Sequence, residues 1–220
     1  MIAIIDYGMG NLKSVSKALE AVGAQVCVSA DCEVLRQAER IVLPGVGAFS
    51  EGMRHLEQLG FIPVLADEVR KKKKPFLGIC LGMQLLAQRS HELGIHRGLG
   101  WIDGEVILLD TGDGRLKVPH VGWDDILFDK DNPMFSGIKP SSSFYFVHSY
   151  HFDCKDKQAV IGTCEYGLNF AAAIQKENIF ATQFHPEKSQ EAGLRLLSNF
   201  VNYSVSAIDV KNTVNPYFAA

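Results

Sequence analysis

The sequence predicts an α/β fold, namely a mostly parallel mixed sheet with helices on both faces and antiparallel strands added in the second half. In the first half, short apolar β runs alternate with helical patterns, an arrangement typical of a parallel sheet covered on both sides. In the second half, β runs follow one another directly, which favours antiparallel pairing. The length of 220 residues and the hydrophobic content of 47% suit one domain with one sizeable core.

Strands in the first half are expected at 2–5, 25–29 and 40–43. Asn11 is expected to cap a helix that Gly23 ends, and Asp31 is expected to cap a short helix. Further helices are predicted at 53–59 and 62–74, the second of which ends in a run of lysines at 71–74. Cations complement the dipole at a helix C-terminus, so this run is interpreted as a solvated helix end.

The second half is expected to begin with a loop at 91–100. Strands are then predicted at 105–109, 115–118, 144–151, 160–164, 171–175 and 179–183. A final helix at 189–201 is expected to turn Leu194, Leu197 and either Phe200 or Val201 inward. The domain is predicted to span 1–203, and 204–220 is interpreted as a polar C-terminal tail.

Charge and composition exclude several classes of partner. A formal net charge of -3 gives no electrostatic reason to expect nucleic acid or a membrane as a partner. The N-terminal residues lack the basic segment and cleavage site of a signal peptide, and no apolar run is long enough to cross a bilayer. The five cysteines are odd in number and widely spaced, which fits a reducing compartment, so a cytoplasmic protein without disulfides is expected.

A sharp turn between a strand and a helix is predicted around Cys80. Gly78 and Gly82 flank this residue in the pattern Gly-x-Cys-x-Gly, which is typical of an elbow that exposes a nucleophile. Unpaired N–H groups at the start of the following helix favour a thiolate over a thiol. The alternative is that the glycines only permit tight packing and Cys80 is an inert buried thiol.

A base and its orienting group are predicted at 185–187. In extended backbone His185 and Glu187 project to the same side, and Pro186 between them limits rearrangement. A nucleophilic thiol needs such an imidazole, and the imidazole needs a group that fixes its orientation. Taken alone, the segment is also consistent with an ordinary turn between a strand and a helix.

A glycine-rich loop at 44–47 follows the strand at 40–43. Loops of this kind expose backbone N–H groups, so Val46 together with Leu81 can supply donors to an oxyanion. A plain turn is the alternative. Gly8 and Gly10 resemble part of a dinucleotide-binding motif, but Lys13 stands where its third glycine belongs, so that reading is set aside.

These segments together resemble a known family. In chain order, the motifs PGVG at 44–47, GICLGMQ at 78–84 and FHPE at 184–187 resemble those of the class I (triad-type) glutamine amidotransferases. The segments PHVGW at 119–123 and YFVHSY at 145–150 are most similar to the glutaminase subunits of imidazole glycerol phosphate synthase. The resemblance covers about 2–201.

The resemblance implies that the chain hydrolyses L-glutamine and passes the ammonia to a (β/α)8-barrel cyclase subunit, as a heterodimer in histidine biosynthesis and without a cofactor or metal. It assigns the roles of nucleophile, base and orienting group to Cys80, His185 and Glu187. It further implies oxyanion contacts from Val46, Gly47 and Leu81, glutamine contacts from Gly45, Gln84, His148, Ser149 and Tyr150, and partner contacts from Asn11, Trp123 and Lys188. Activity is expected to depend on the partner.

Two features depart from the resemblance, namely Asp124-Asp125 where the pattern usually has Asn after Gly-Trp, and the long tail at 204–220. They leave open a related glutaminase subunit that supplies ammonia for amidine-containing surface sugars. A γ-glutamyl hydrolase, a cysteine peptidase and a non-enzymatic glutamine-binding subunit are further alternatives. A zinc site made of His148, His151, Cys154 and Cys164 is disfavoured because no Cys-x2-Cys pair is present.

Overall fold

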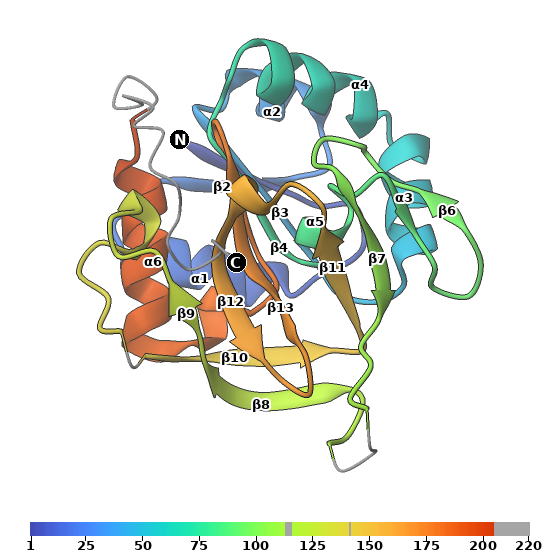
Figure 1. Ribbon diagram of the computed structural model, residues 1–220. Coiled ribbons are helices and arrows are strands. Elements are labelled where there is room, and N and C mark those ends of the chain that lie inside the picture. Colours follow the sequence, from blue (N-terminus) through green and yellow to red (C-terminus); the bar gives the residue numbers. More distant parts are fainter. Residues whose placement is uncertain (113–115, 141, 205–220) are drawn as a thin grey trace.

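An eight-stranded sheet forms the centre of the computed structural model, which describes residues 1–112, 116–140 and 142–204 (Figure 1). Its strand order is β2-β1-β3-β4-β14-β13-β12-β9. The parallel part comprises β2 (Val26–Ser29), β1 (Ile2–Ile5), β3 (Arg40–Gly45), β4 (Phe76–Cys80) and β14 (Ile179–Thr182). The antiparallel part comprises β13 (Asn169–Lys176), β12 (Val160–Glu165) and β9 (Leu127–Phe128). The predicted mixed sheet is confirmed.

Helices cover both faces of this sheet and bury separate apolar clusters. On one face, α1 (Leu12–Ala21) packs against α6 (Gln190–Asn202), the final helix. On the other face lie α2 (Cys32–Gln37), α3 (Phe49–Gln58) and α4 (Phe61–Leu65). Asn11 and Asp31 cap α1 and α2 through side-chain oxygens, as the sequence predicts.

Two smaller sheets lie beside the main one. The first pairs β8 (His120–Asp125) with β10 (Ser143–His148), and the second has the order β11-β7-β5-β6. Its strands are β11 (Tyr150–Cys154), β7 (Gly104–Leu108), β5 (Arg89–Ser90) and β6 (His96–Arg97). Short helical turns occur at Pro133–Phe135, Lys157–Ala159 and Pro186–Lys188.

Several predicted elements are wrong in extent. The strand expected at 144–151 is divided at Ser149, and its two halves join different sheets. The strand expected at 115–118 is absent at 116–118, while Arg115 lies outside the described residues, and β8 follows instead. The expected loop at 91–100 contains β6. In α6, Leu194 is 36% exposed, and Leu196 is buried beside Leu197 and Phe200.

The lysine run at 71–74 is not a simply solvated helix end. The helix expected at 62–74 is shorter and consists of α4 followed by a π-helical segment, Ala66–Lys71. Within that segment the fully buried Glu68 carboxylate pairs with Lys72 at 2.7 Å and with Lys74 at 2.6 Å. The cations are placed here because a buried carboxylate needs paired positive charge.

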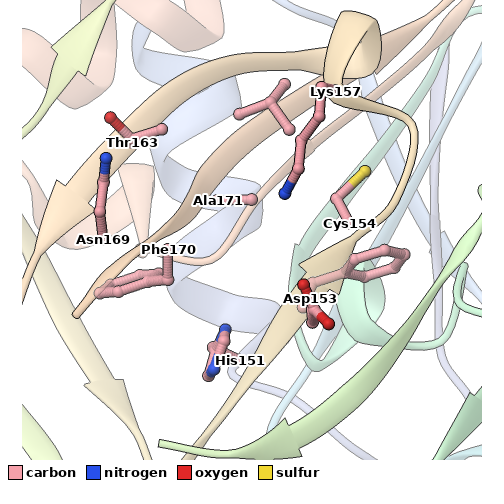
Figure 2. A pocket seen from close by; sticks show the side chains of 10 residues that line it. His151, Asp153, Cys154, Lys157, Thr163, Asn169, Phe170 and Ala171 are labelled. Carbon is pink, nitrogen blue, oxygen red and sulfur yellow. The ribbon is translucent and has the colours of Figure 1, made fainter. Parts of the chain in front are cut away.

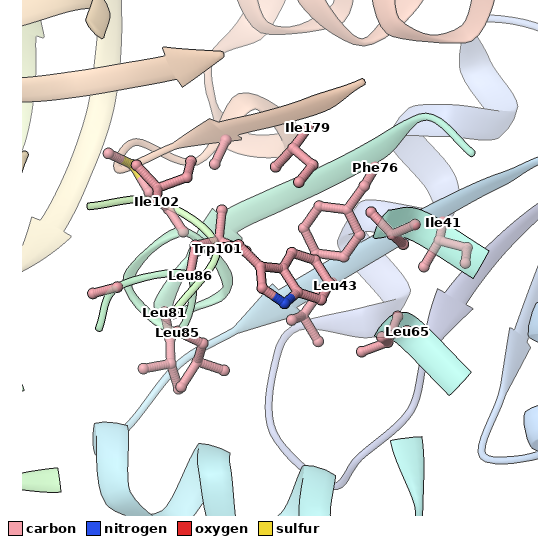
Figure 3. Packing of buried hydrophobic residues seen from close by; sticks show 14 of the residues in the cluster. Ile41, Leu43, Leu65, Phe76, Leu81, Leu85, Leu86, Trp101, Ile102 and Ile179 are labelled. Carbon is pink, nitrogen blue, oxygen red and sulfur yellow. The ribbon is translucent and has the colours of Figure 1, made fainter. Parts of the chain in front are cut away.

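A densely packed apolar cluster supports the end of β4 (Figure 3). Phe76 and Trp101 meet edge to face with ring centroids 5.5 Å apart, and Leu81, Leu85 and Leu86 pack in the same cluster. Close packing of large side chains resists local movement. The turn after β4 is therefore held on a rigid base.

Candidate active site

Cys80 is the last residue of β4 and has φ 54° and ψ −106°, a conformation that few residues other than glycine adopt. The flanking glycines make this turn possible. A Cβ on Gly82 would lie 1.9 Å from the Leu43 carbonyl oxygen, and one on Gly78 would lie 2.6 Å from the Gly82 oxygen. The helix that follows, α5 (Leu81–Gln84), is a single turn.

His185 lies three residues after the end of β14 and immediately before the Pro186–Lys188 turn, which contains Glu187. The His185 Nδ1 and Glu187 Oε1 atoms are 2.8 Å apart, and the side chains are only 2% and 1% exposed. Ser189 Oγ donates to the His185 carbonyl at 2.7 Å, and the His185 N–H donates to the Tyr145 carbonyl. The His185 ring is therefore held by the Glu187 carboxylate, and the His185 backbone is held by hydrogen bonds to Ser189 and Tyr145.

The charge state of His185 depends on burial and on two neighbours. Burial lowers its pKa, but Cys80 and Glu187 together raise the pKa to about 9. The ring is therefore a cation at neutral pH, the form that donates a proton to a leaving group. Its Nε2 makes no hydrogen bond of normal geometry with the described residues, although Cys80 is close enough to contribute to the pKa. Because Nδ1 faces Glu187, Nε2 is the buried nitrogen that remains to face Cys80.

A cavity of about 390 Å³ opens beside Cys80. It is lined by seven residues that the sequence assigned to the oxyanion hole or to glutamine binding: Val46, Gly47, Leu81, Gln84, His148, Ser149 and Tyr150. Gly45 does not line it. Gly45 lies behind it, where a Cβ would be 2.3 Å from the buried Tyr7 hydroxyl oxygen. Small-molecule sites commonly have volumes of this order.

The cavity also contains residues that sequence reasoning missed, namely Glu92, Pro119 and Val147. Glu92 follows β5, and its Oε2 accepts a hydrogen bond from the Phe49 N–H at 2.6 Å. A lone acidic residue in a stretch interpreted as loop carries no sequence signal. It becomes a candidate only because the fold brings it into the same cavity as Cys80.

The side-chain amide of Gln84 is hydrogen-bonded within the protein. Its Nε2 donates to the Tyr150 carbonyl at 2.8 Å and to Gln183 Oε1 at 3.0 Å. Gln183, which the sequence analysis did not single out, donates in turn to Cys80 Sγ at 3.6 Å. The two amides therefore connect the nucleophile to the wall of the cavity.

A chain of hydrogen bonds reaches His148 from the surface. Asp124 Oδ2 is 2.6 Å from His120 Nε2, and His120 Nδ1 is 3.1 Å from His148 Nε2. His148 Nδ1 in turn lies 2.9 Å from the Tyr150 carbonyl oxygen, to which it must donate. His148 Nε2 is then the acceptor in a neutral ring, so His120 donates from both of its nitrogens.

The pKa of His148 supports the neutral form assigned to it, whereas the pKa of His120 has opposing causes. Burial lowers the pKa of His148 to about 3, and the ring is neutral. Burial also lowers the pKa of His120, whereas Asp124 raises it. The two acceptors around His120 are both satisfied only by its imidazolium form. Burial outweighs Asp124, so the pKa of His120 is lowered overall, and it is the two acceptors in direct contact with its ring nitrogens that assign the imidazolium form.

The three residues assigned to partner contacts lie on neighbouring elements. Trp123 is 46% exposed and meets Tyr145 edge to face, with ring centroids 5.9 Å apart. Lys188 Nζ lies 5.4 Å from the centroid of the same Tyr145 ring. Asn11 caps α1, which packs against the Pro186–Lys188 turn. These residues adjoin the His185 segment.

Metal-binding clusters, disulfides and membrane-spanning helices are all absent from the part of the chain that the structure describes. Within 1–112, 116–140 and 142–204, no three His, Cys, Asp or Glu side chains gather as ligands of a metal ion would. All five cysteines are free. None of the helices described is both long and apolar enough to cross a membrane.

Comparison with known proteins gives a consistent result. The sequence profile of the family Glutamine amidotransferase class-I matches residues 3–203. One relative is "Imidazole glycerol phosphate synthase subunit HisH 1" of Campylobacter jejuni subsp. jejuni serotype O:23/36 (strain 81-176), with 50% sequence identity. The alignment covers 91% of this chain and 98% of that protein. Another is "Imidazole glycerol phosphate synthase subunit HisH" of Aquifex aeolicus (strain VF5), with 52% identity over 90% of this chain and 94% of that protein.

Solved structures share the fold at low sequence identity. A structure entitled "Structure of PurLQS from Thermotoga maritima" aligns with a TM-score of 0.70 and 19% identity, over 92% of this chain and 97% of that chain. Another, entitled "Crystal structure of glutamine amidotransferase", has a TM-score of 0.70 and 16% identity, over 91% of this chain and 100% of that chain.

Proposed function

Because the chain belongs to the glutamine amidotransferase class-I family, we propose that it is the glutaminase subunit of an imidazole glycerol phosphate synthase. It hydrolyses L-glutamine and delivers the ammonia to a (β/α)8-barrel cyclase subunit in histidine biosynthesis. The observation that carries the proposal is the meeting of the strained Cys80 and the buried His185–Glu187 pair beside a cavity of about 390 Å³.

The reaction proceeds through a thioester. Cys80 Sγ attacks the side-chain amide carbon of glutamine, and the oxygen takes up negative charge beside the backbone N–H groups of Val46, Gly47 and Leu81. His185 donates its proton to the leaving nitrogen, the C–N bond breaks and ammonia departs. The same ring then removes a proton from water, which attacks the γ-glutamyl thioester, so the C–S bond breaks, glutamate leaves, and Cys80 returns to the thiolate beside a protonated His185.

The charges in the cavity suit a zwitterionic substrate. Glu92 is the carboxylate among the lining residues, so it is assigned to the α-ammonium group of glutamine. His148, Ser149 and Tyr150 also line the cavity, and their backbone groups are assigned to the remaining polar groups of the substrate. Gln84 acts at one remove, since its side chain is bonded to Tyr150 and Gln183.

The partner surface includes Asn11, Trp123 and Lys188. Trp123 and Lys188 meet through Tyr145, and Tyr145 accepts the backbone hydrogen bond of His185. A cyclase that docks here contacts Trp123 and Lys188, and both of these contact Tyr145, which is hydrogen-bonded to His185. Turnover that depends on the partner is therefore part of the proposal.

Two alternatives fit the observations less well. The names of the relatives, at about 50% identity, favour the histidine enzyme over a surface-sugar paralogue. A non-enzymatic glutamine-binding subunit has no need of a strained thiol beside a buried imidazole and carboxylate.

The test measures glutamate release from L-glutamine by the purified chain, alone and with a histidine-pathway cyclase subunit and its nucleotide ligand. Strong stimulation by the cyclase is expected, with no release by Cys80→Ala. Labelling by an electrophilic glutamine analogue, lost in Cys80→Ala, separates an enzyme from a binding module. Robust turnover without any partner, or no stimulation in the complete mixture, would contradict the proposal.

A further inference from the structure

A second cavity, of about 360 Å³, lies between β11, β12 and β13 (Figure 2). None of its lining residues lines the cavity beside Cys80. Its walls combine the apolar side chains of Phe152, Val160, Phe170 and Ala171 with a few polar groups. This composition is typical of sites for small organic molecules.

The first polar group is His151, which is 5% exposed. Neither of its ring nitrogens makes a hydrogen bond of normal geometry with a residue that the structure describes. Burial lowers the pKa of His151, so the ring is neutral and offers one donor and one acceptor. Buried polar groups normally find partners. Figure 2 shows the ring at the edge of the cavity, near Phe170, where a ligand can supply the missing bonds.

The second polar group is Lys157, whose ammonium group points toward the cavity in Figure 2. It forms no ion pair with any part of the chain that the structure describes. The two nearby lysines differ in this respect, because Lys155 pairs with Asp153 and Lys176 pairs with Asp156. The Asp153 carboxylate also lines the cavity, but Lys155 pairs with it, so Lys157 is the lining cation without an ion pair among the described residues.

These groups together define a ligand class. One cation matches one negative charge, and a dianion such as phosphate would remain half unpaired. The apolar walls require a short hydrocarbon part, and the neutral ring of His151 requires a group that both donates and accepts. Thr163 and Asn169 add polar atoms at another part of the lining.

We propose that this cavity is a binding site for a small monocarboxylate with a short apolar body. Its carboxylate pairs with Lys157, and its hydroxyl substituent bonds to the ring of His151. The site is separated from the glutamine cavity by one step along β11, because Tyr150 lines that cavity and His151 lines this one.

The experiment is an NMR titration of the full chain with ¹⁵N-labelled histidine, in which His151→Gln assigns the ring resonances. The probes are butyrate, 3-hydroxybutyrate, butyramide and butylamine, which share a four-carbon body and differ in charge and polar substituent. We expect His151 to shift with butyrate, to shift at lower concentration with 3-hydroxybutyrate, and to stay unchanged with butylamine. No shift with either carboxylate, or equal binding of amine and carboxylate, would overturn the proposal.

Two variants locate the site. Lys157→Met is expected to weaken carboxylate binding about fivefold, the effect of losing one partly solvated ion pair. Lys17→Met, on the exposed side of α1, makes the same change in net charge and is expected to leave binding unchanged. Ala171→Leu, which fills the cavity, is expected to abolish binding while the other histidine signals confirm the fold. Unaltered affinity in Lys157→Met would show that the cation is not used.

Because the readout is binding at His151, this test does not depend on catalysis. A failure of the proposed glutaminase activity would leave its outcome unchanged.

Discussion

At the scale of single residues, burial and direct contact decide which side chains have chemical roles. Three of the histidines illustrate this. His185 contacts Glu187 and has a raised pKa, whereas His148 is buried beside other histidines and has a pKa of about 3. Neither ring nitrogen of His151 makes a hydrogen bond of normal geometry with the described residues. The same residue type is therefore proposed as a base at 185, is a neutral acceptor at 148 and is a candidate ligand contact at 151.

Glu187→Gln tests the role of the carboxylate. We expect lower turnover with glutamine binding retained, because the carboxylate orients His185 and does not react. The pKa of His185 should fall from about 9 toward its ordinary value of 6.5. A pKa raised on folding adds stability that is complete below about pH 6.5 and is lost as the pH rises through 9. The variant should therefore lose stability at pH 6 and much less at pH 10, as measured by denaturation at both values. Loss of glutamine binding would contradict the orienting role.

Asp124→Asn tests the hydrogen-bond chain to His148. We expect the pKa of His120 to fall in NMR titration and the KM for glutamine to rise about fivefold, because a partly exposed charged contact contributes about 1 kcal/mol. The matched control is Asp125→Asn. Asp125 accepts a hydrogen bond from Ser143 Oγ at 2.6 Å and takes no part in the hydrogen bonds that link Asp124 to His148. Its variant should therefore change neither the pKa of His120 nor the KM for glutamine. Equal effects of the two variants would exclude the assigned role.

At the scale of elements, the strand-turn-helix around Cys80 depends on two close backbone contacts. Gly78 and Gly82 are needed because any Cβ would collide with main-chain oxygen atoms. The surrounding apolar cluster then holds Cys80 at a positive φ. The turn is therefore strained by the packing around it.

The strain is measurable by comparing Cys80→Gly with Cys80→Ala. At φ 54° glycine relieves strain of about 1–3 kcal/mol, less its own entropy cost of about 0.5–1 kcal/mol. We expect Cys80→Gly to be more stable than Cys80→Ala by about 1 kcal/mol in denaturant unfolding. At Cys164, in a regular stretch of β12, the order should reverse. If glycine is the less stable variant at both positions, the elbow is not strained.

At the scale of the whole molecule, the proposed cyclase surface and the base are joined through Tyr145. The surface is formed by β8, β10 and the Pro186–Lys188 turn, which are distant in sequence. Binding of a partner at this surface is therefore expected to affect His185 through contacts already present.

Trp123→Ala tests this surface. Exposed tryptophans at interfaces often contribute more than 1 kcal/mol, so we expect affinity for the cyclase to fall about tenfold or more while activity of the lone chain is unchanged. Ile95→Ala, at an exposed apolar residue beside β6, should leave affinity unaltered. Unchanged cyclase affinity in Trp123→Ala would exclude Trp123 from the interface.

The sequence by itself determined the mixed sheet, the caps at Asn11 and Asp31, and the types of residue at 80, 185 and 187. These features depend on local patterns, because periodicity, capping and turn residues act over a few positions. Only the tertiary structure decided that the strand at 144–151 is divided at Ser149 and that Glu92 lines the cavity beside Cys80. It also decided the hydrogen bonds that link Asp124 to His148 and the cavity at His151. Each of these depends on contacts between distant segments, and spacing along the chain carries no record of such contacts.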